Sequence, residues 1–83
     1  MNEQIARTEK QLGAIMRRIR KQSGLTQSGL GARVHLRQGT ISRLEAGEPA
    51  IQLHTVMEAL SALGLEMVLR PRSESAAGIE DLF

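Results

Sequence analysis

The chain has 83 residues, enough for one small domain, and a net charge of +2. It contains no cysteine, which excludes a fold held by disulfides or by a thiolate metal site. Because no apolar run approaches the length of a membrane span and no signal peptide is recognisable, the sequence predicts a cytoplasmic protein. Phe83 is the sole aromatic residue, which argues against stacking on the bases of single-stranded nucleic acid.

Basic residues are concentrated in one part of the chain. No Asp or Glu occurs between residues 10 and 44, and this window carries a charge of +8, whereas the remainder carries −6. Its basic residues are Lys10, Arg17, Arg18, Arg20, Lys21, Arg33, Arg37 and Arg43. Such a distribution favours binding to a polyanion such as DNA, although a basic face that only contacts solvent has the same sequence pattern.

The first predicted helix begins after a polar segment, residues 1–7, that we expect to be frayed. Thr8 and Gln11 have the spacing of a capping box, and Gly24 is expected to end the helix near residue 23. A buried stripe is predicted at the 3.6-residue period, comprising Leu12, Ile15, Met16 and Ile19. The basic residues of this helix, Arg17, Arg18, Arg20 and Lys21, are expected on its other faces.

Two shorter helices follow, predicted for residues 27–33 and 38–45, with Thr26 as the cap of the first of them. Each has an apolar pair one turn apart, and Leu36 is expected to fill the corner between the helices. The outward residues are mostly Arg, Gln, Ser and Thr. This pattern is typical of a helix-turn-helix unit, whose second helix enters the major groove of DNA. His35 is expected in the turn with a positive φ, or alternatively as a pH switch or metal ligand.

The fourth helix is predicted for residues 53–63 and is ended by Gly64, which completes a domain of residues 8–64. Its predicted apolar stripe comprises Leu53, Val56, Met57, Leu60 and Leu63. Met16 and Met57 are both expected to fill the core.

Residues 65–71 are predicted to form a strand, with Leu65, Met67 and Leu69 on one face and Pro71 at its end. Since a lone strand leaves its backbone unpaired, we expect it to pair with the same strand of a second copy across a two-fold axis. The predicted fold is therefore mainly α, with four helices and one C-terminal strand that joins a homodimer. Residues 72–83 are predicted to be a flexible tail, whose last five residues form either an interaction motif or an ordinary disordered end.

Side-chain chemistry assigns roles in DNA binding to the helix-turn-helix residues. Gln38 can bond to an adenine edge and Arg37 to a guanine edge. The predicted base contacts are Arg37, Gln38, Gly39 and Ser42. The predicted contacts to the DNA backbone are Thr26, Gln27, Thr40, Arg43, Arg17 and Arg18.

The stretch L-T-Q-x-x-L-x-x-x-V-x-L-x-Q-x-T-I-S-R-L-E-x-G, from Leu25 to Gly47, resembles the Cro/cI (XRE-type) helix-turn-helix family. With the flanking helices, the resemblance covers about residues 9–64. It departs from that family at Gly31, where Ala is usual, at His35, where Gly is usual, and at Arg37, where a small polar cap is usual. The resemblance implies that Gln27 braces Gln38.

The whole layout, with a strand and a short tail after four helices, resembles the HipB-type antitoxins. This resemblance implies a homodimeric repressor of its own operon that binds an inverted-repeat operator and a HipA-type serine/threonine kinase toxin. It also implies that the end of the tail, Leu82 and Phe83, contacts the toxin. Two alternatives are a stand-alone repressor or controller protein and, less favoured, an interaction adaptor that does not bind DNA. We do not expect an enzyme, a cofactor or a metal, since no catalytic grouping, phosphate loop or metal cluster is recognisable.

Overall fold

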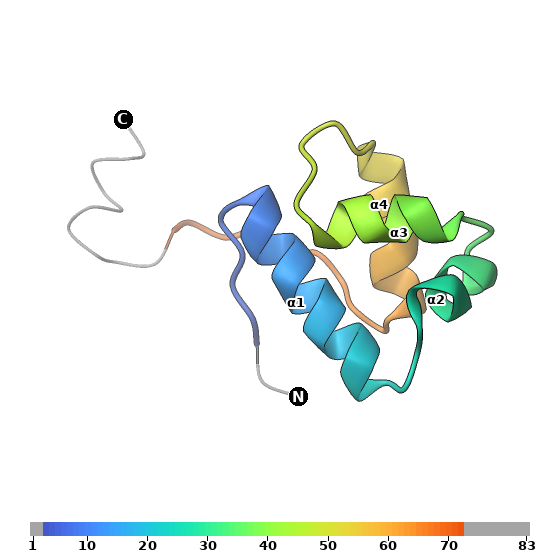
Figure 1. Ribbon diagram of the computed structural model, residues 1–83. Helices are drawn as coiled ribbons and strands as arrows, with labels where there is room; N and C mark the ends of the chain where they lie inside the picture. The colour runs from blue at the N-terminus through green and yellow to red at the C-terminus, as the bar shows by residue number, and fades with distance from the viewer. Residues whose placement is uncertain (1–2, 73–83) are drawn as a thin grey trace.

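The computed structural model describes residues 3–72, which contain four helices (Figure 1). These are α1 (Glu9–Gln22), α2 (Gln27–Arg33), α3 (Gln38–Glu45) and α4 (Leu53–Ala62). α3 packs against both α1 and α2, and α2 also packs against α4. The predicted bounds of α2 and α3 are confirmed, and those of α1 and α4 hold to within one residue at their C-terminal ends. No helix in the described part of the chain is long and apolar enough to cross a membrane.

The helix ends follow the local chemistry that their sequences predict. The amide of Gln11 donates to Thr8 Oγ1 over 3.1 Å, while Gln11 Oε1 accepts from the amide of Arg7 over 2.6 Å. The return bond of this cap therefore reaches one residue further back than a capping box requires. The Thr26 cap is also confirmed, since the amide of Gly29 donates to its hydroxyl over 2.9 Å. His35 has a φ of 57°, so the predicted left-handed turn is present and is made by a residue other than glycine.

The core lies where all four helices meet. Its buried apolar residues are Met16, Ile19, Leu30, Ile41, Leu44, Val56, Ala59, Leu60 and Leu63. Leu12, Ile15, Leu25 and Leu36 are half-buried against it. The predicted stripe of α1 is therefore confirmed, with Met16 only 1% exposed.

The predicted stripe of α4 is wrong at two positions. Leu53 is 64% exposed and Met57 is 44% exposed, so Met57 does not fill the core. The buried face of α4 is rotated toward Ala59, which is fully buried. Because Ala59 is small, an apolar pattern built on large side chains gave it no weight and placed the centre of the face too far toward Met57.

Gly13 and Gly31 lie against the backbone of other segments, Gly13 at the end of α3 and Gly31 at the turn before α3. A Cβ on Gly13 would lie 2.5 Å from the carbonyl oxygen of Glu45, and one on Gly31 would lie 2.4 Å from that of Leu36. Both distances are too short for any side chain. The close packing at Gly31 accounts for the glycine at a position where the resembling family usually has Ala, and the role of Gly13 was not predicted.

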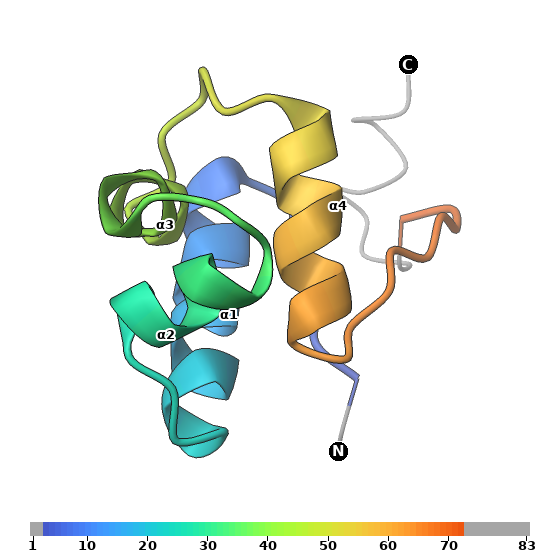
Figure 2. The ribbon, with the colours of Figure 1, turned by 90° about the vertical axis from the view of Figure 1, so that its right-hand side faces the viewer.

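Residues 65–72 leave α4 without regular secondary structure and run back along it (Figure 2). No strand forms within residues 3–72, because a single chain offers this segment no partner for its backbone. Met67, Val68 and Leu69 are 44%, 67% and 89% exposed. Pairing with a second copy stays a prediction.

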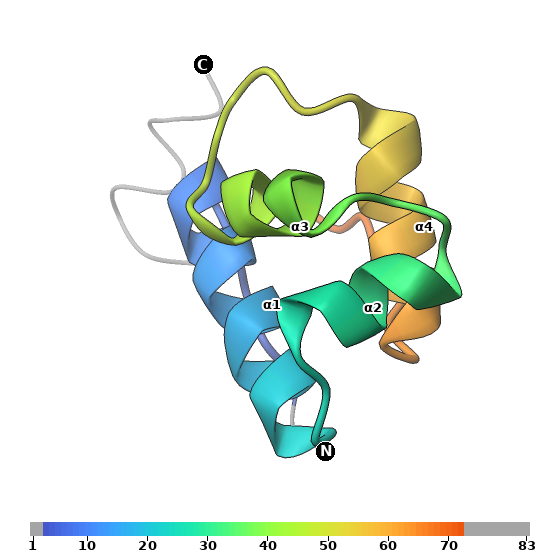
Figure 3. The same cartoon turned by 45° about the vertical axis from the view of Figure 1, so that its right-hand side comes forward.

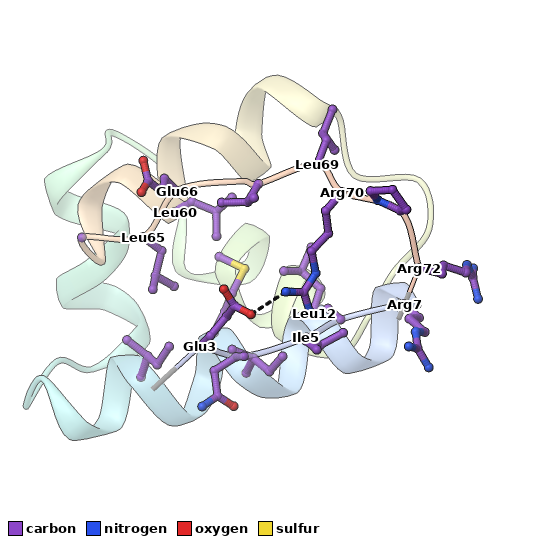
Figure 4. A pocket seen from close by; sticks show the side chains of 18 residues that line it. Glu3, Ile5, Arg7, Leu12, Leu60, Leu65, Glu66, Leu69, Arg70 and Arg72 are labelled. Atoms are coloured by element: carbon purple, nitrogen blue, oxygen red, sulfur yellow. Dashed lines mark hydrogen bonds and ion pairs between the residues drawn. The ribbon is translucent and has the colours of Figure 1, made fainter. Parts of the chain in front are cut away.

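Residues 3–7 and 65–72 border a groove of about 720 Å³ that reaches the core residues Met16 and Leu60 (Figure 4). Arg70 Nη1 lies 2.7 Å from Glu3 Oε1 and joins the two segments. Leu65 and Leu69, which the predicted strand has on one face, both line the groove. Val68 lines it too, although the alternation of a strand would put it on the opposite face. The groove therefore exposes apolar side chains from both faces of the predicted strand.

Candidate nucleic-acid interface

α2 and α3 are joined by the turn at His35 and pack side by side (Figure 3). Ile41 and Leu44 anchor α3 in the core, with 0% and 5% of their surfaces exposed. The opposite side of α3 is polar and open to solvent. Its exposed residues are Arg37, Gln38, Gly39 and Arg43, and Thr40 and Ser42 are half-buried. The fold thus brings the four predicted base-contacting residues together, with Arg37 as the N-cap of α3 and Gln38, Gly39 and Ser42 within the helix.

The predicted backbone contacts come from three helices. Arg17 and Arg18 are exposed on α1, and Arg18 donates a hydrogen bond to the side chain of Gln4. Thr26 is exposed at the start of α2, where its hydroxyl oxygen accepts the capping bond and its hydroxyl hydrogen can still donate to a phosphate. Leu82 and Phe83, the predicted toxin contacts, lie outside the described residues.

A buried ion pair joins α1 to α3 beneath this face. Arg20 Nε lies 2.5 Å from Glu45 Oε2, and Arg20 Nη2 donates to Glu45 Oε1 over 3.0 Å. Arg20 Nη1 also donates to the carbonyl oxygen of Leu25 over 2.7 Å. The side chains of Arg20 and Glu45 are only 7% and 4% exposed.

The prediction that Arg20 lies on a face of α1 other than the buried one is therefore wrong, and the role of Glu45 is not predicted. Arg20 lies one turn after Met16, on the buried side of α1, and this spacing was the available signal. Glu45 is the first acidic residue after the basic window, and this position was a second signal that it pairs with a basic residue. Burial of an arginine is stable here because Glu45 neutralises its charge and accepts its hydrogen bonds.

The ion pair keeps Glu45 ionised. Burial by itself would raise the pKa of Glu45, but hydrogen bonds from Arg20 and Gln27 and the charges of Arg20 and Arg17 outweigh it, so the pKa is lowered. The hydrogen bond to Glu45 raises the pKa of Arg20 despite its burial. The stability that Glu45 contributes is thus present above its unfolded pKa and is lost as the pH falls through its lower folded pKa.

A chain of hydrogen bonds connects this pair to the surface of α3. Gln27 Nε2 donates to Glu45 Oε1 over 3.1 Å, and Gln38 Nε2 donates to Gln27 Oε1 over 2.5 Å. The bracing of Gln38 by Gln27 that the family resemblance implies is therefore present. It holds an exposed side chain at the N-terminal end of α3 in one orientation.

Once Arg20 is paired with Glu45, the remaining basic residues of the window between positions 10 and 44 are all exposed. They are Lys10, Arg17, Arg18, Lys21, Arg33, Arg37 and Arg43. A polar, braced helix in a domain with several exposed cations suits the combination of base-reading side chains and phosphate contacts. The fold and this face define a helix-turn-helix protein.

Comparison with known proteins gives a narrower assignment. Residues 11–72 match the helix-turn-helix domain family. The chain is 36% identical over 75 residues to antitoxin HipB of Escherichia coli O6:H1 (strain CFT073), covering 87% of this chain and 80% of HipB. It is 37% identical over 59 residues to antitoxin HipB of Escherichia coli (strain K12), covering 71% of this chain and 67% of HipB.

Solved structures agree with this assignment. A HipB–O4 20mer complex and a HipA–HipB–O2–O3 complex each match with a TM-score of 0.76 and 34% identity. Each match covers 82% of this chain and 96% of the matched chain. The chain belongs to the helix-turn-helix family and, within it, to the HipB antitoxins.

Proposed function

We propose that the protein is an antitoxin that binds operator DNA as a homodimer, represses its own operon and binds a HipA-type kinase toxin. The observation that carries the DNA-binding part is the exposed, polar face of α3, on which Gln38 is held by Gln27. The relatives support both partners, since HipB has been solved in a HipB–O4 20mer complex and in a HipA–HipB–O2–O3 complex.

In this proposal, α3 lies in the major groove and reads base edges with Arg37, Gln38, Gly39 and Ser42. Gln38 bonds to adenine, Arg37 bonds to guanine, and Gly39 lets α3 approach the bases closely. The phosphates are bound by Thr26, Gln27, Thr40, Arg43, Arg17 and Arg18. These phosphate contacts orient α3 on the duplex and do not depend on the DNA sequence. A repressor of this kind acts where the chromosome lies, which places the protein in the cytoplasm.

The homodimer is supported by the exposed apolar residues that follow α4. Leu65, Met67 and Leu69 belong to a segment with no regular structure in the single chain, beside a groove that opens to the core. Pairing with the same segment of a second copy satisfies its backbone and covers these side chains. The two recognition helices then read half-sites about one helical turn apart, roughly 34 Å.

The test of DNA binding uses the full-length protein and a duplex selected from a random library. Fluorescence anisotropy measures binding to this duplex and to one with a scrambled sequence. Gln38→Ala is expected to weaken binding to the selected duplex by about 1–3 kcal/mol and to relax one base position. Gln52→Ala changes an exposed glutamine at the start of α4, away from α3, and serves as the matched control. Full discrimination by Gln38→Ala would refute the assignment of Gln38.

The test of toxin binding co-expresses a HipA-type kinase with the full-length protein or with a chain that ends at Arg72. Recovery of a complex whose affinity falls on truncation supports both the antitoxin role and a contact by Leu82 and Phe83. Equal recovery by both chains retains the antitoxin role and removes the tail contact. Absence of any complex, with DNA binding intact, favours a stand-alone repressor.

A further inference from the structure

The two ends of a glutamine amide are chemically different, so its orientation decides which base edge it matches. Nε2 carries two donors, whereas Oε1 only accepts. Adenine offers an acceptor at N7 beside a donor at N6, and a glutamine matches this pair by donating from Nε2 and accepting at Oε1. A mechanism that fixes the amide orientation of Gln38 therefore contributes to base discrimination.

The orientation of Gln27 is fixed from inside the protein. An ionised carboxylate has acceptors only, so a side-chain amide that bonds to Glu45 must present its nitrogen. Gln27 Nε2 lies 3.1 Å from Glu45 Oε1, in agreement with this requirement. Gln27 Oε1 is thereby directed away from Glu45 and toward α3.

The orientation of Gln38 follows from that of Gln27. Gln27 Oε1 accepts only, so Gln38 must present Nε2 to it, as it does over 2.5 Å. One amide hydrogen of Gln38 is used in this contact. The second hydrogen and Oε1 are the donor and the acceptor that an adenine edge requires.

Glu45 is itself held in place. Arg20 bonds to both of its oxygens and is anchored in turn by the carbonyl oxygen of Leu25. The Arg20 and Glu45 side chains are almost fully buried, so water does not compete for these bonds. The rigid end of the chain of hydrogen bonds is therefore in the core, and its exposed end is at the surface that reads DNA.

We infer that Glu45, held by Arg20, is a positioning residue for base readout: through Gln27 it sets the donor and acceptor order that Gln38 presents to DNA. This inference rests on the proposed function. It extends the ion pair from a structural role to a role in specificity. It also predicts that an acidic residue at position 38, which would accept from cytosine, is disfavoured, because Gln27 Oε1 would then face a carboxylate.

The first test removes both charges together, with Arg20→Met and Glu45→Leu in one full-length protein. Replacing a buried ion pair with apolar residues of similar size usually preserves the fold, since no unpaired charge remains. Binding is measured on the selected duplex and on duplexes with each other base pair at the position that Gln38 reads. A bidentate contact gives discrimination of roughly 5- to 150-fold, and the double variant is expected to reduce it to about threefold or less at that position alone.

A purely structural ion pair predicts a different result. A double variant that unfolds cooperatively and discriminates at the Gln38 position as well as the unaltered protein would overturn the inference. Failure of the proposed function is distinguishable, because the unaltered protein itself would then bind selected and scrambled duplexes equally.

A second test uses suppression and replaces the Glu45 carboxylate by an amide, which removes its charge but keeps a side chain that can form hydrogen bonds with Arg20 and Gln27. Gln38→Glu alone is expected to bind every duplex at least about tenfold more weakly, as its carboxylate faces Gln27 Oε1. Adding Glu45→Gln supplies an amide that can donate to Gln27 Oε1, which lets the Gln27 amide reverse and donate to residue 38. Recovered binding with a preference for cytosine supports the inference, and no recovery in a folded double variant contradicts it.

Discussion

Two regions of the molecule differ in whether a single chain can pair their polar groups and bury their apolar ones. One is the interface between α1 and α3, and the other is the segment that follows α4. Under α3, the buried Arg20 and Glu45 satisfy each other, and no buried side-chain nitrogen or oxygen in the described part of the chain lacks a hydrogen bond. After α4, by contrast, Val68 and Leu69 are mostly exposed beside a groove that reaches the core. In the proposed function, the geometry of DNA recognition is therefore built within one chain, whereas burial of this apolar surface requires a second.

This difference separates two kinds of variant. Changes under α3 are expected to alter the stability and the specificity of each chain. Changes after α4 are expected to alter assembly and to leave the helices intact. Four predictions test this separation, from the largest expected effect to the smallest.

Glu45→Ala is expected to lower the free energy of unfolding by about 3–5 kcal/mol, because it leaves Arg20 buried without its counter-charge. Urea denaturation followed by circular dichroism measures the change. Glu48→Ala, at an exposed position three residues further on, serves as the control. A loss below about 1 kcal/mol would show that water reaches Arg20 and that the pair is not part of the core.

Met67→Asp with Leu69→Asp is expected to weaken dimerisation by at least roughly 100-fold, since each apolar side chain contributes about 1.5–3 kcal/mol when fully buried. Analytical ultracentrifugation measures the dimer dissociation constant, and helix content should not change. Ala50→Asp with Gln52→Asp adds the same charge at exposed positions before α4. Equal effects of the two pairs of substitutions would attribute the loss to charge and remove residues 65–70 from the dimer interface.

Gly31→Ala and Gly39→Ala are expected to change stability in opposite directions. The new methyl group at position 31 meets the carbonyl oxygen of Leu36, which should cost about 1–3 kcal/mol. At position 39, nothing lies within 4 Å of the added Cβ, so improved helix propensity should add up to about 1 kcal/mol. Urea midpoints of the two variants compare them directly. Equal stabilisation by both would mean that the approach of α2 to the turn is looser than the structure shows.

Glu3→Gln is expected to change the free energy of unfolding by less than about 0.5 kcal/mol, because the Glu3–Arg70 pair is largely exposed. Thermal unfolding at low and moderate salt measures it. A larger, salt-sensitive loss would make residues 3–7 part of the folded domain, whereas the sequence predicts that they are frayed.

Sequence reasoning placed α2 and α3 correctly because their signals are local. Thr26 caps α2, His35 turns the chain, and the apolar pairs have helical spacing. The sequence also predicts which residues of α3 face outward, since a polar face opposite an apolar one can be recognised from the order of residues alone. The brace from Gln27 to Gln38 came from family resemblance, because it joins side chains from two helices.

Contacts between distant residues explain what was missed. The burial of Arg20 is not predicted because its partner, Glu45, lies on another helix 25 residues away. Gly13 matters because α1 crosses the end of α3 at that point, and only the folded arrangement shows the crossing. The predicted core position of Met57 is wrong because a pattern of large apolar residues gives no weight to Ala59, which lies on the buried face of α4.

The series of hydrogen bonds that links Arg20, Glu45, Gln27 and Gln38 also affects how the DNA specificity of such a protein can change in evolution. If Gln38 reads a base as proposed and Glu45 positions it as inferred, a new base preference at position 38 requires compatible changes at Gln27 and Glu45, so a single mutation there is disfavoured. Gly39 has no side chain and no neighbour within 4 Å of an added Cβ, so it can be replaced alone. Among descendants of one ancestral gene, we therefore expect operators to drift first at the bases near Gly39 and last at the base read by Gln38.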